Sequence, residues 1–277
     1  MNADRLPPGL YVVATPIGNL ADLGPRAAET LRRADLVLAE DKRVTAKLLS
    51  HAGSKSRLAN YNDHSSESDR DSIVARLGSE AIALVSDAGT PLISDPGYKL
   101  VRAARDAGHS IYTLPGPSAL IAALTLAGLP TDRFLFGGFL PAKAKARREA
   151  LAELADIRAT LVFYETGPRL GDALEAMRDV LGNREGAVVR EISKLYEESV
   201  TGSLAELAEL YAGNQPKGEI VVVVGPPEQA EASDDDLDRA LTDAMRDASP
   251  SRAAAEVATR LKIPRKRAYA RALELSR

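Results

Sequence analysis

Short runs of β-branched and aliphatic residues alternate along the chain with segments whose apolar positions recur at helical spacing. In the first half this pattern predicts strands at Leu10–Ala14, Leu36–Ala39, Ala81–Val85 and Ile111–Leu114, and helices at Pro25–Arg33, Val44–His51, Glu67–Leu77 and Tyr98–Ala107. A second series has strands at Phe134–Phe139, Thr160–Tyr164, Ala187–Arg190 and Glu219–Val224, and helices at Lys143–Ala155, Arg169–Leu181 and Leu204–Tyr211. The alternation predicts an α/β fold in which helices pack on sheets.

Prolines and glycines mark two breaks in this pattern. Pro115-Gly116-Pro117 lies between the two series, and Gly225-Pro226-Pro227 ends the last strand. We therefore expect an N-terminal α/β domain at 1–117, a C-terminal α/β domain at 118–227 and a small helical piece at 228–277.

The charge is unevenly distributed in the last piece. The formal net charge of the chain is −3, but residues 228–247 hold eight acidic and two basic residues, and residues 249–277 hold eight basic and two acidic ones. Residues 250–269 read as a helix, a short turn and a second helix that starts at Pro264. This is the pattern of a helix-turn-helix, whose second helix can meet a phosphate backbone. A small bundle with a solvated basic face also explains the pattern, and on the residues alone it is favoured.

Composition removes several classes of function. The chain has no cysteine and three histidines, which excludes disulfides, thiolate zinc sites, iron–sulfur clusters and a cysteine nucleophile, so we expect no metal site. The first residues lack the apolar core of a signal peptide. The longest mostly apolar stretch, Ala119–Leu129, has 11 residues, far fewer than the ~20 that span a bilayer. We expect a cytoplasmic protein without a membrane partner.

One loop stands out as a candidate ligand site. Ser86–Gly97 places twelve residues, including two aspartates, between a predicted strand and a predicted helix. Open α/β sheets bind ligands at the carboxyl ends of their strands, and the small Ala88 and Gly89 let a ligand approach the backbone. Asp87 can face a cationic ligand. The alternative is a capping loop in which Asp95 caps the helix.

Three other loops are interpreted more simply. Thr15–Leu20 lacks the dinucleotide fingerprint G-x-G-x-x-G and reads as a plain turn. For Ser118 we favour a helix-capping role over a ligand contact. Glu40–Arg43 reads as a solvated helix start.

Several motifs together resemble one bacterial family. They are Val12–Leu20, Glu40–Arg43, Ser86–Gly97, Leu114–Ala119, Gly138–Pro141 and Lys217–Glu219, in that order. The sequence resembles the ribosomal RNA small-subunit methyltransferase I family of the tetrapyrrole methylase superfamily. One loop departs from the family pattern, which is usually Tyr-His-Glu-His-Asn. In this chain residues 61–65 are Tyr-Asn-Asp-His-Ser, so only the tyrosine and the second histidine match. No role given to the first histidine of that motif can hold in this chain.

The resemblance implies a fold and a reaction. It implies two α/β domains with a cofactor cleft between them, a homodimer, and S-adenosylmethionine-dependent methylation of the ribose 2′-hydroxyl of a cytidine in the 16S ribosomal RNA of the small subunit. Matched to the superfamily's loops, the cofactor contacts are Pro16, Asp87, Ala88, Gly89, Thr90, Ile93, Pro117, Ser118, Ala119, Leu140 and Tyr164, with Glu191 as a further wall of the cleft.

This reaction needs positioned partners and benefits from a general base. The candidates for the base are Asp41, His64, Asp87 and Glu191, which we leave unranked. The candidates for holding RNA are Arg43, Lys143, Lys145, Arg147, Arg148, Lys194, Arg265, Lys266 and Arg267. For residues 143–148, a solvated helix face is an equally good interpretation. The alternatives for the whole chain are a methyltransferase acting on a small molecule such as a tetrapyrrole, and a ligand-sensing DNA-binding regulator.

Overall fold

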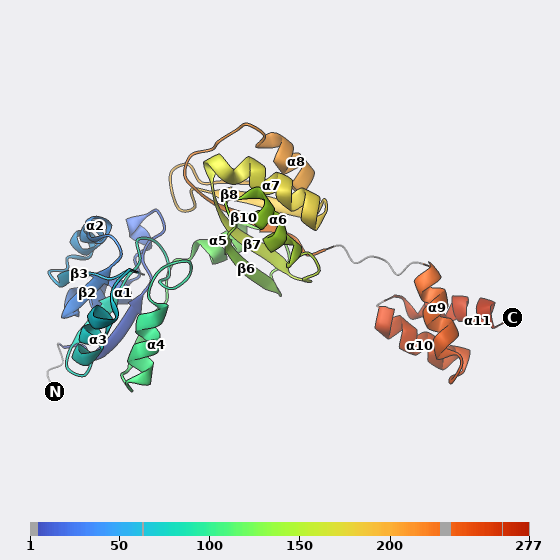
Figure 1. The fold of residues 1–277 in the computed structure, drawn as a ribbon, viewed down its shortest axis with the longest axis horizontal. Helices are drawn as coiled ribbons and strands as arrows, with labels where there is room; N and C mark the ends of the chain where they lie inside the picture. Colours follow the sequence, from blue (N-terminus) through green and yellow to red (C-terminus); the bar gives the residue numbers. More distant parts are fainter. Residues whose placement is uncertain (1–4, 63, 228–233, 262, 277) are drawn as a thin grey trace. The chain divides into compact units, whose positions relative to one another are not determined.

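The computed structural model describes residues 5–62, 64–227, 234–261 and 263–276. The chain divides into two compact units, residues 1–227 and 228–277. The first unit contains two five-stranded sheets, each covered by helices, so the predicted α/β class is confirmed (Figure 1). We retain 1–117, 118–227 and 228–277 as a proposal for the domains.

The first sheet is parallel throughout, in the order β3-β2-β4-β1-β5. Its strands are β1 (Gly9–Val13), β2 (Leu36–Ala39), β3 (Arg57–Asn60), β4 (Ala81–Leu84) and β5 (Ile111–Leu114). On one face lie α1 (Pro25–Arg33) and α2 (Lys42–Ala52), and on the other α3 (Glu67–Arg76) and α4 (Tyr98–Asp106). Because both faces are covered, β2 and β4 are apolar at every position.

The second sheet is mixed, in the order β6-β7-β10-β8-β9. Its strands are β6 (Phe134–Phe139), β7 (Thr160–Thr166), β8 (Glu185–Arg190), β9 (Glu198–Ser203) and β10 (Glu219–Val224). Only β6 and β7 pair in parallel, whereas the other neighbours are antiparallel. The central place of β10 agrees with its uninterrupted apolar run.

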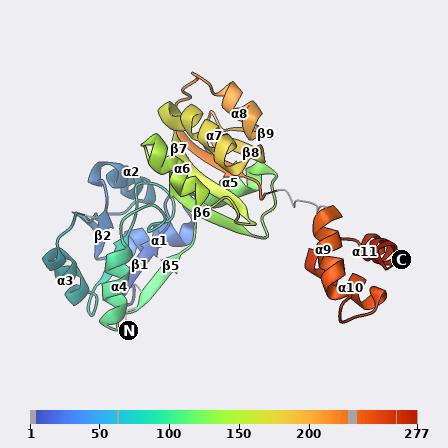
Figure 2. The ribbon, with the colours of Figure 1, turned by 45° about the vertical axis from the view of Figure 1, so that its right-hand side comes forward.

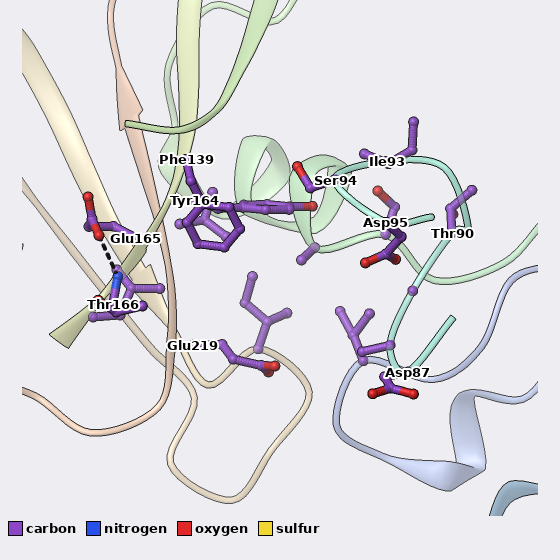
Figure 3. A pocket seen from close by; sticks show the side chains of 18 of the residues that line it. Asp87, Thr90, Ile93, Ser94, Asp95, Phe139, Tyr164, Glu165, Thr166 and Glu219 are labelled. Carbon is purple, nitrogen blue, oxygen red and sulfur yellow. Dashed lines mark hydrogen bonds between the residues drawn. The ribbon is translucent and has the colours of Figure 1, made fainter. Parts of the chain in front are cut away.

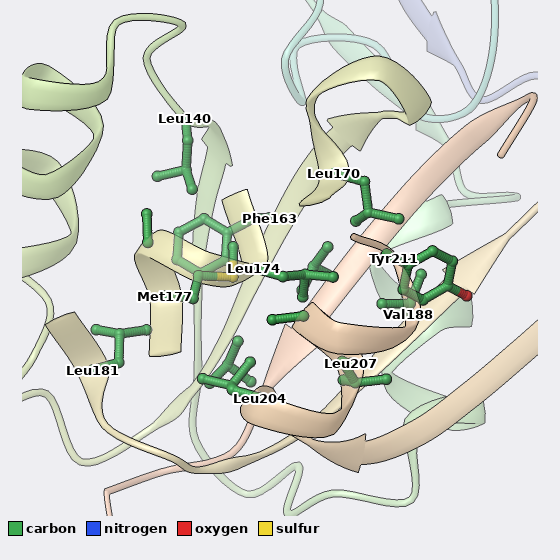
Figure 4. Close-up of a cluster of buried hydrophobic side chains, with 14 of the residues drawn as sticks. Leu140, Phe163, Leu170, Leu174, Met177, Leu181, Val188, Leu204, Leu207 and Tyr211 are labelled. Atoms are coloured by element: carbon green, nitrogen blue, oxygen red, sulfur yellow. The ribbon is translucent and has the colours of Figure 1, made fainter. Parts of the chain in front are cut away.

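Helices cover both faces of this second sheet. The helix α5 (Ala119–Ala127) packs on one face, and α6 (Ala144–Ala152), α7 (Gly167–Leu181) and α8 (Leu204–Leu210) pack on the other (Figure 2). On the second of these faces, Phe163 is fully buried among leucines and Met177 (Figure 4). This core holds β7 rigidly, and β7 carries Tyr164 on its opposite face.

Two features of the second sheet differ from the predictions. The strand β9 was not predicted, because it lies at the sheet edge and none of its side chains is buried, so its sequence has no apolar run. The helix α6 ends at Ala152 and not at Ala155.

The second unit is a three-helix bundle formed by α9 (Asp234–Ala244), α10 (Pro250–Leu261) and α11 (Arg265–Leu275). Leu237, Leu241 and Val257 pack against Ala268 and Ala272, whose small side chains allow the helices to approach closely. Pro264 is the N-cap of α11, one position before the predicted one. Among the described residues, no helix is long and apolar enough to span a membrane.

Candidate active site

The loops that follow β1, β2, β4 and β5 meet at one edge of the first sheet, because parallel strands present their carboxyl ends together. The longest, Ser86–Gly97, folds back on the first: the backbone groups of Thr15 and Gly89 exchange hydrogen bonds of 2.8 and 3.1 Å. The Thr90 hydroxyl donates to the Pro117 carbonyl at 3.1 Å. These contacts fix the backbone around Asp87–Thr90.

A pocket of about 350 Å³ opens where these loops face the second sheet (Figure 3). The second sheet contributes Phe139 from β6, Tyr164 from β7 and Val221 from β10. The rings of Phe139 and Tyr164 meet edge to face, with centroids 5.6 Å apart. The pocket therefore has polar loops on one side and an aromatic wall on the other.

Eight of the eleven predicted cofactor residues line this pocket: Asp87, Ala88, Gly89, Thr90, Ile93, Ser118, Ala119 and Tyr164. Pro16, Pro117 and Leu140 are not among the lining residues. Leu140 is 4% exposed and packs into the core around Phe163, so its side chain faces away from a ligand in this pocket. Ile17 lines the pocket in place of Pro16, which also corrects the interpretation of Thr15–Leu20 as a plain turn.

The structure excludes two capping roles, the one favoured for Ser118 and the one left as an alternative for Asp95. Ser118 occupies the N-cap position of α5, but its side chain makes no capping hydrogen bond and lines the pocket instead. Asp95 does not cap α4, because the N-cap is Gly97. A Cβ at Gly97 would lie 2.8 Å from a Leu84 methyl carbon, so the tight packing of this turn leaves no room for a side chain.

The pocket is acidic. Its lining includes Glu40, Asp87, Asp95, Glu165 and Glu219, and no lysine, arginine or histidine among the described residues. Asp87 accepts a hydrogen bond from the Asp41 backbone N–H at 3.0 Å. Glu165 is buried beside Arg169, with Oε1 and Nε 3.1 Å apart, and burial raises the pKa of its carboxyl group. The charge of this lining favours a cationic ligand over a phosphate.

Asp95 was not among the site residues predicted from the sequence, and the structure places it in the pocket lining. Burial raises the pKa of its carboxyl group to about 6, the Ser86 hydroxyl opposes this shift by donating a hydrogen bond, and the charges of Glu40 and Asp87 add to it. Leu92 and Ser94, just before it, have φ angles of 76° and 62°. Such left-handed conformations are strained for these residues and often occur at functional sites. The sequence signal was available, since Asp95 is the second aspartate of the long loop.

The family follows from a comparison with known proteins. The model of the family described as "Tetrapyrrole (Corrin/Porphyrin) Methylases" matches residues 9–208. The chain belongs to the tetrapyrrole methylase family. A second family model, described as "RsmI C-terminal HTH domain", matches residues 231–276.

Relatives of this tetrapyrrole methylase match it over nearly its whole length. It is 56% identical to a protein of Erythrobacter litoralis over 274 residues, 99% of this chain and 98% of that protein. It is 47% identical to a protein of Mesorhizobium japonicum over 276 residues, 99% of this chain and 94% of the other. Both relatives are named "Ribosomal RNA small subunit methyltransferase I". The family resemblance inferred from the sequence motifs is confirmed.

Solved structures support the fold of this methylase. Diphthine synthase matches with a TM-score of 0.61 at 16% identity, covering 78% of this chain and 90% of that one. Uroporphyrin-III-C-methyltransferase from Thermus thermophilus matches with a TM-score of 0.56 at 22% identity, covering 78% and 93%. At these identities the likeness shows a shared fold.

The four predicted candidates for the base in this tetrapyrrole methylase lie in different surroundings. Only Asp87 lines the pocket. Asp41 caps α2, and hydrogen bonds from Arg43 lower the pKa of its carboxyl group to about 2. His64 is exposed outside the lining, and its backbone N–H donates to the Asn62 side chain at 3.0 Å. Asp63, in the same loop, lies outside the described residues.

Glu191, the fourth candidate, forms part of an ion cluster at the end of β8. The ammonium group of Lys194 lies 2.9 Å from a Glu191 carboxylate oxygen and 2.8 Å from one of Glu219. The hydrogen bond from Lys194 lowers the pKa of the Glu191 carboxyl group. Lys194 is therefore neutralised by two carboxylates, which disfavours its predicted contact with a phosphate.

The predicted RNA-binding residues of the first unit differ in exposure. Arg43 and Lys145 each have side chains 90% exposed, and Lys143 is exposed as well. Arg148 pairs with Asp179 at 2.7 Å. Arg147 is wrongly predicted, because its side chain is 5% exposed and packs beneath the helix near Asp172, where no phosphate can reach it.

In the second unit, the three predicted RNA-binding residues begin α11. Arg265 and Lys266 are exposed. Arg267 pairs with Asp234 of α9 at 3.0 Å, and Arg271 pairs with Asp238 at 2.6 Å. The acidic helix α9 thus neutralises one side of α11, and Arg265 and Lys266 lie outside these two pairs. No group of three or more acidic, histidine or cysteine side chains suited to a metal occurs among the described residues.

Proposed function

We propose that this chain transfers a methyl group from S-adenosylmethionine to the ribose 2′-hydroxyl of a cytidine in the 16S ribosomal RNA of the small subunit. The acidic pocket is the observation that carries this proposal. It combines carboxylates with small residues and an aromatic wall, and its lining has no cationic side chain among the described residues. The names of full-length relatives support ribosomal RNA of the small subunit as the substrate.

The residues of the pocket fit the cofactor in charge and size. S-adenosylmethionine carries a sulfonium and an ammonium group, which carboxylates stabilise and lysines or arginines would repel. Ligand pockets usually measure about 300–1,000 Å³, and this one measures about 350 Å³. Gly89 has a φ of +80°, and its missing Cβ keeps the backbone accessible beside Ile17. Asp87, the backbone of Ala88–Thr90 and Ser118 would hold the cofactor.

The protein's main task in this reaction is positioning. When bound, S-adenosylmethionine supplies an electrophilic methyl carbon on a positively charged sulfur. The doubly anchored loop of Asp87–Thr90 and the rigid wall of Phe139 and Tyr164 orient the ligand and exclude water. Orientation of two partners can contribute ~7–11 kcal/mol to lowering a barrier.

RNA phosphates would bind outside this acidic pocket. We propose that the exposed Arg43, Lys143 and Lys145 of the first unit and Arg265 and Lys266 of the second provide the electrostatic contacts. Changing Arg265 and Lys266 together to glutamine should reduce the slope of log affinity against log salt by about 0.7 per lost phosphate contact. An unchanged slope would remove α11 from the RNA interface.

We also propose a cytoplasmic homodimer. The helix α5 is apolar except for Thr125 and leaves Ile121 and Leu126 exposed, which would suit a contact between two copies. Light scattering should give twice the chain mass for the wild type and the single mass for Ile121→Asp/Leu126→Asp. A wild-type monomer would refute the dimer.

The decisive experiment follows the methyl group. Small ribosomal subunits from cells that lack the endogenous enzyme are incubated with the protein and labelled S-adenosylmethionine, and the RNA is digested and mapped. Label on a cytidine ribose supports the proposal. Transfer only to a tetrapyrrole substrate would support the small-molecule alternative, and binding of DNA without transfer to any substrate would support a regulator.

A further inference from the structure

The last helix of the second unit, α11, leaves one face exposed to solvent. Its small residues Ala268 and Ala272 are buried in the core of the bundle. On the side toward α9 it carries two arginines that pair with aspartates of that helix at 3.0 and 2.6 Å. The remaining face exposes Arg265, Lys266 and Tyr269. The helix therefore has a buried side, a neutralised side and a side open to a partner.

Helical spacing brings the three exposed side chains together. Residues three and four positions apart are neighbours on a helix surface, with Cβ atoms about 5–6 Å apart. Tyr269 follows Lys266 by three positions and Arg265 by four. Both cations lie outside the ion pairs that α9 forms with α11. We call these three residues the α11 patch.

The bundle is built without the ring of Tyr269. Its core consists of leucine, alanine and valine side chains, and Tyr269 is 42% exposed outside it. Leu273, one turn further along α11, is exposed to the same extent. Single exposed apolar residues are common on protein surfaces. The feature that distinguishes Tyr269 is the pair of cations beside it, which suits a ligand that has both flat rings and negative charges.

We propose that the α11 patch binds an unpaired stretch of RNA, with one base stacked on Tyr269 and the flanking phosphates held by Arg265 and Lys266. This inference rests on the proposed function, which makes RNA the substrate. It differs from the usual use of a helix-turn-helix, whose second helix lies in the major groove of duplex DNA.

The aromatic ring decides between an unpaired and a paired strand. The major groove of duplex RNA is too deep and narrow for side chains, so proteins contact such a duplex through its phosphates and 2′-hydroxyls. Unpaired bases can instead stack on aromatic side chains, and cations beside the ring can hold the backbone. A duplex would engage Arg265 and Lys266 and leave the ring of Tyr269 without a contact.

The first test compares two RNAs on the full-length chain, an unstructured oligonucleotide and a blunt duplex. We expect Tyr269→Ala to weaken binding of the unstructured RNA by about 5- to 150-fold, the range for loss of one stacked base. Tyr269→Phe keeps the ring and should stay within about twofold of the wild type. Affinity for the duplex should change by less than about threefold in both variants, because paired bases do not reach the ring.

Two controls separate stacking from other contacts. Leu273→Ala removes an equally exposed apolar side chain without a ring, and it should stay within about threefold of the wild type on the unstructured RNA. Tyr269→Ala should leave the slope of log affinity against log salt unchanged, because stacking releases no counterions. Lys266→Gln should reduce that slope by about 0.7, as for one lost phosphate contact with a single strand.

A fluorescent reporter tests the stacking directly. The chain has no tryptophan, so Tyr269→Trp introduces a single indole at the patch. A base stacked on the indole quenches its emission, whereas RNA bound elsewhere on the chain does not reach it. We expect the unstructured RNA to quench the emission of this variant and the duplex to leave it nearly unchanged.

The outcomes separate this inference from the proposed function. Equal affinity of the wild type and Tyr269→Ala for the unstructured RNA, or no quenching by that RNA in Tyr269→Trp, overturns the stacking role. Duplex RNA or DNA that depends on Tyr269 as strongly as the unstructured RNA overturns the choice of an unpaired strand. Loss of binding to small subunits without loss of binding to naked RNA assigns the patch to a protein and also overturns the inference.

In each of these cases, a wild-type chain that methylates ribosomal RNA leaves the proposed function standing. A wild-type chain that neither binds RNA nor transfers methyl groups overturns the proposed function, and the role of the α11 patch with it.

Discussion

Replacing Lys194 with glutamine tests whether this residue serves the fold or the RNA. Its ammonium group lies within 2.9 Å of carboxylate oxygens of Glu191 and Glu219, and its side chain is 27% exposed. Burial alone would lower its pKa, but the hydrogen bonds to the two glutamates outweigh this effect and raise it. The cluster carries one net negative charge, so it should repel a phosphate.

The expected loss of unfolding free energy follows from how exposed each of the two ion pairs is. The bond to Glu191 is partly buried, and hydrogen bonds to charged groups contribute about 1.5–3 kcal/mol. The Glu219 side chain is 73% exposed, and exposed pairs contribute about 0.2–1 kcal/mol because solvent screens them. We expect Lys194→Gln to lower the free energy of unfolding by about 2 kcal/mol.

The assay combines urea unfolding with RNA binding at several salt concentrations. For Lys194→Gln the salt slope should stay unchanged, because the replaced charge is already neutralised. The matched control is Lys145→Gln, at a side chain 90% exposed, which should keep unfolding within about 0.5 kcal/mol of the wild type. The reasoning is refuted if Lys194→Gln lowers the salt slope while leaving stability unchanged.

Three further expectations concern the pocket, a buried arginine and the second unit. Gly89→Ala should weaken binding of S-adenosylhomocysteine in calorimetry, because the φ of +80° and a contact of 3.3 Å with Ile17 oppose a Cβ at this position. The control Gly128→Ala, at a φ of +67° in open space, should leave binding intact. Both variants should lose about 1–2 kcal/mol of stability in urea unfolding. Arg147→Gln should lower the free energy of unfolding by about 1–3 kcal/mol without changing RNA binding. Arg148→Gln should lower the free energy of unfolding by less than about 1 kcal/mol. Equal losses of stability in the two variants would contradict the burial of Arg147. Removal of residues 228–277 should leave calorimetric cofactor binding unchanged and weaken RNA binding in a salt-dependent way, and equal RNA affinity at all salt concentrations would contradict this.

Much of the candidate site could be located from the sequence because one loop carries most of it. The loop Ser86–Gly97 is long, has two aspartates and small residues, and follows a buried strand. These local features predict a ligand site at a strand end, and the structure places Asp87, Gly89 and Ile93 in the pocket lining. The role of the loop's second aspartate stayed open, since a helix cap and a pocket carboxylate look alike until the helix start is known.

Burial and pairing of charged side chains could not be predicted in the same way. Arg147 and Arg148 are neighbours in one basic stretch and both pair with aspartates of α7, yet the Arg147 side chain is 5% exposed and the Arg148 side chain 49%. Lys194 looks like any surface lysine until β8 and β10 bring Glu191 and Glu219 to it. A charge count along the chain does not contain these contacts, because all of them except Lys194–Glu191 join residues distant in sequence.

The sequence by itself determined the α/β class, the central place of β10 and the loop that lines the pocket, because apolar periodicity and turn residues act locally. The tertiary structure alone decided that the pocket is acidic. Glu40 follows β2, Asp87 and Asp95 lie in the loop after β4, and Glu219 begins β10. Only the folded chain places these residues around one space. The energy of a charge depends on its neighbours and on its access to water, and folding sets both.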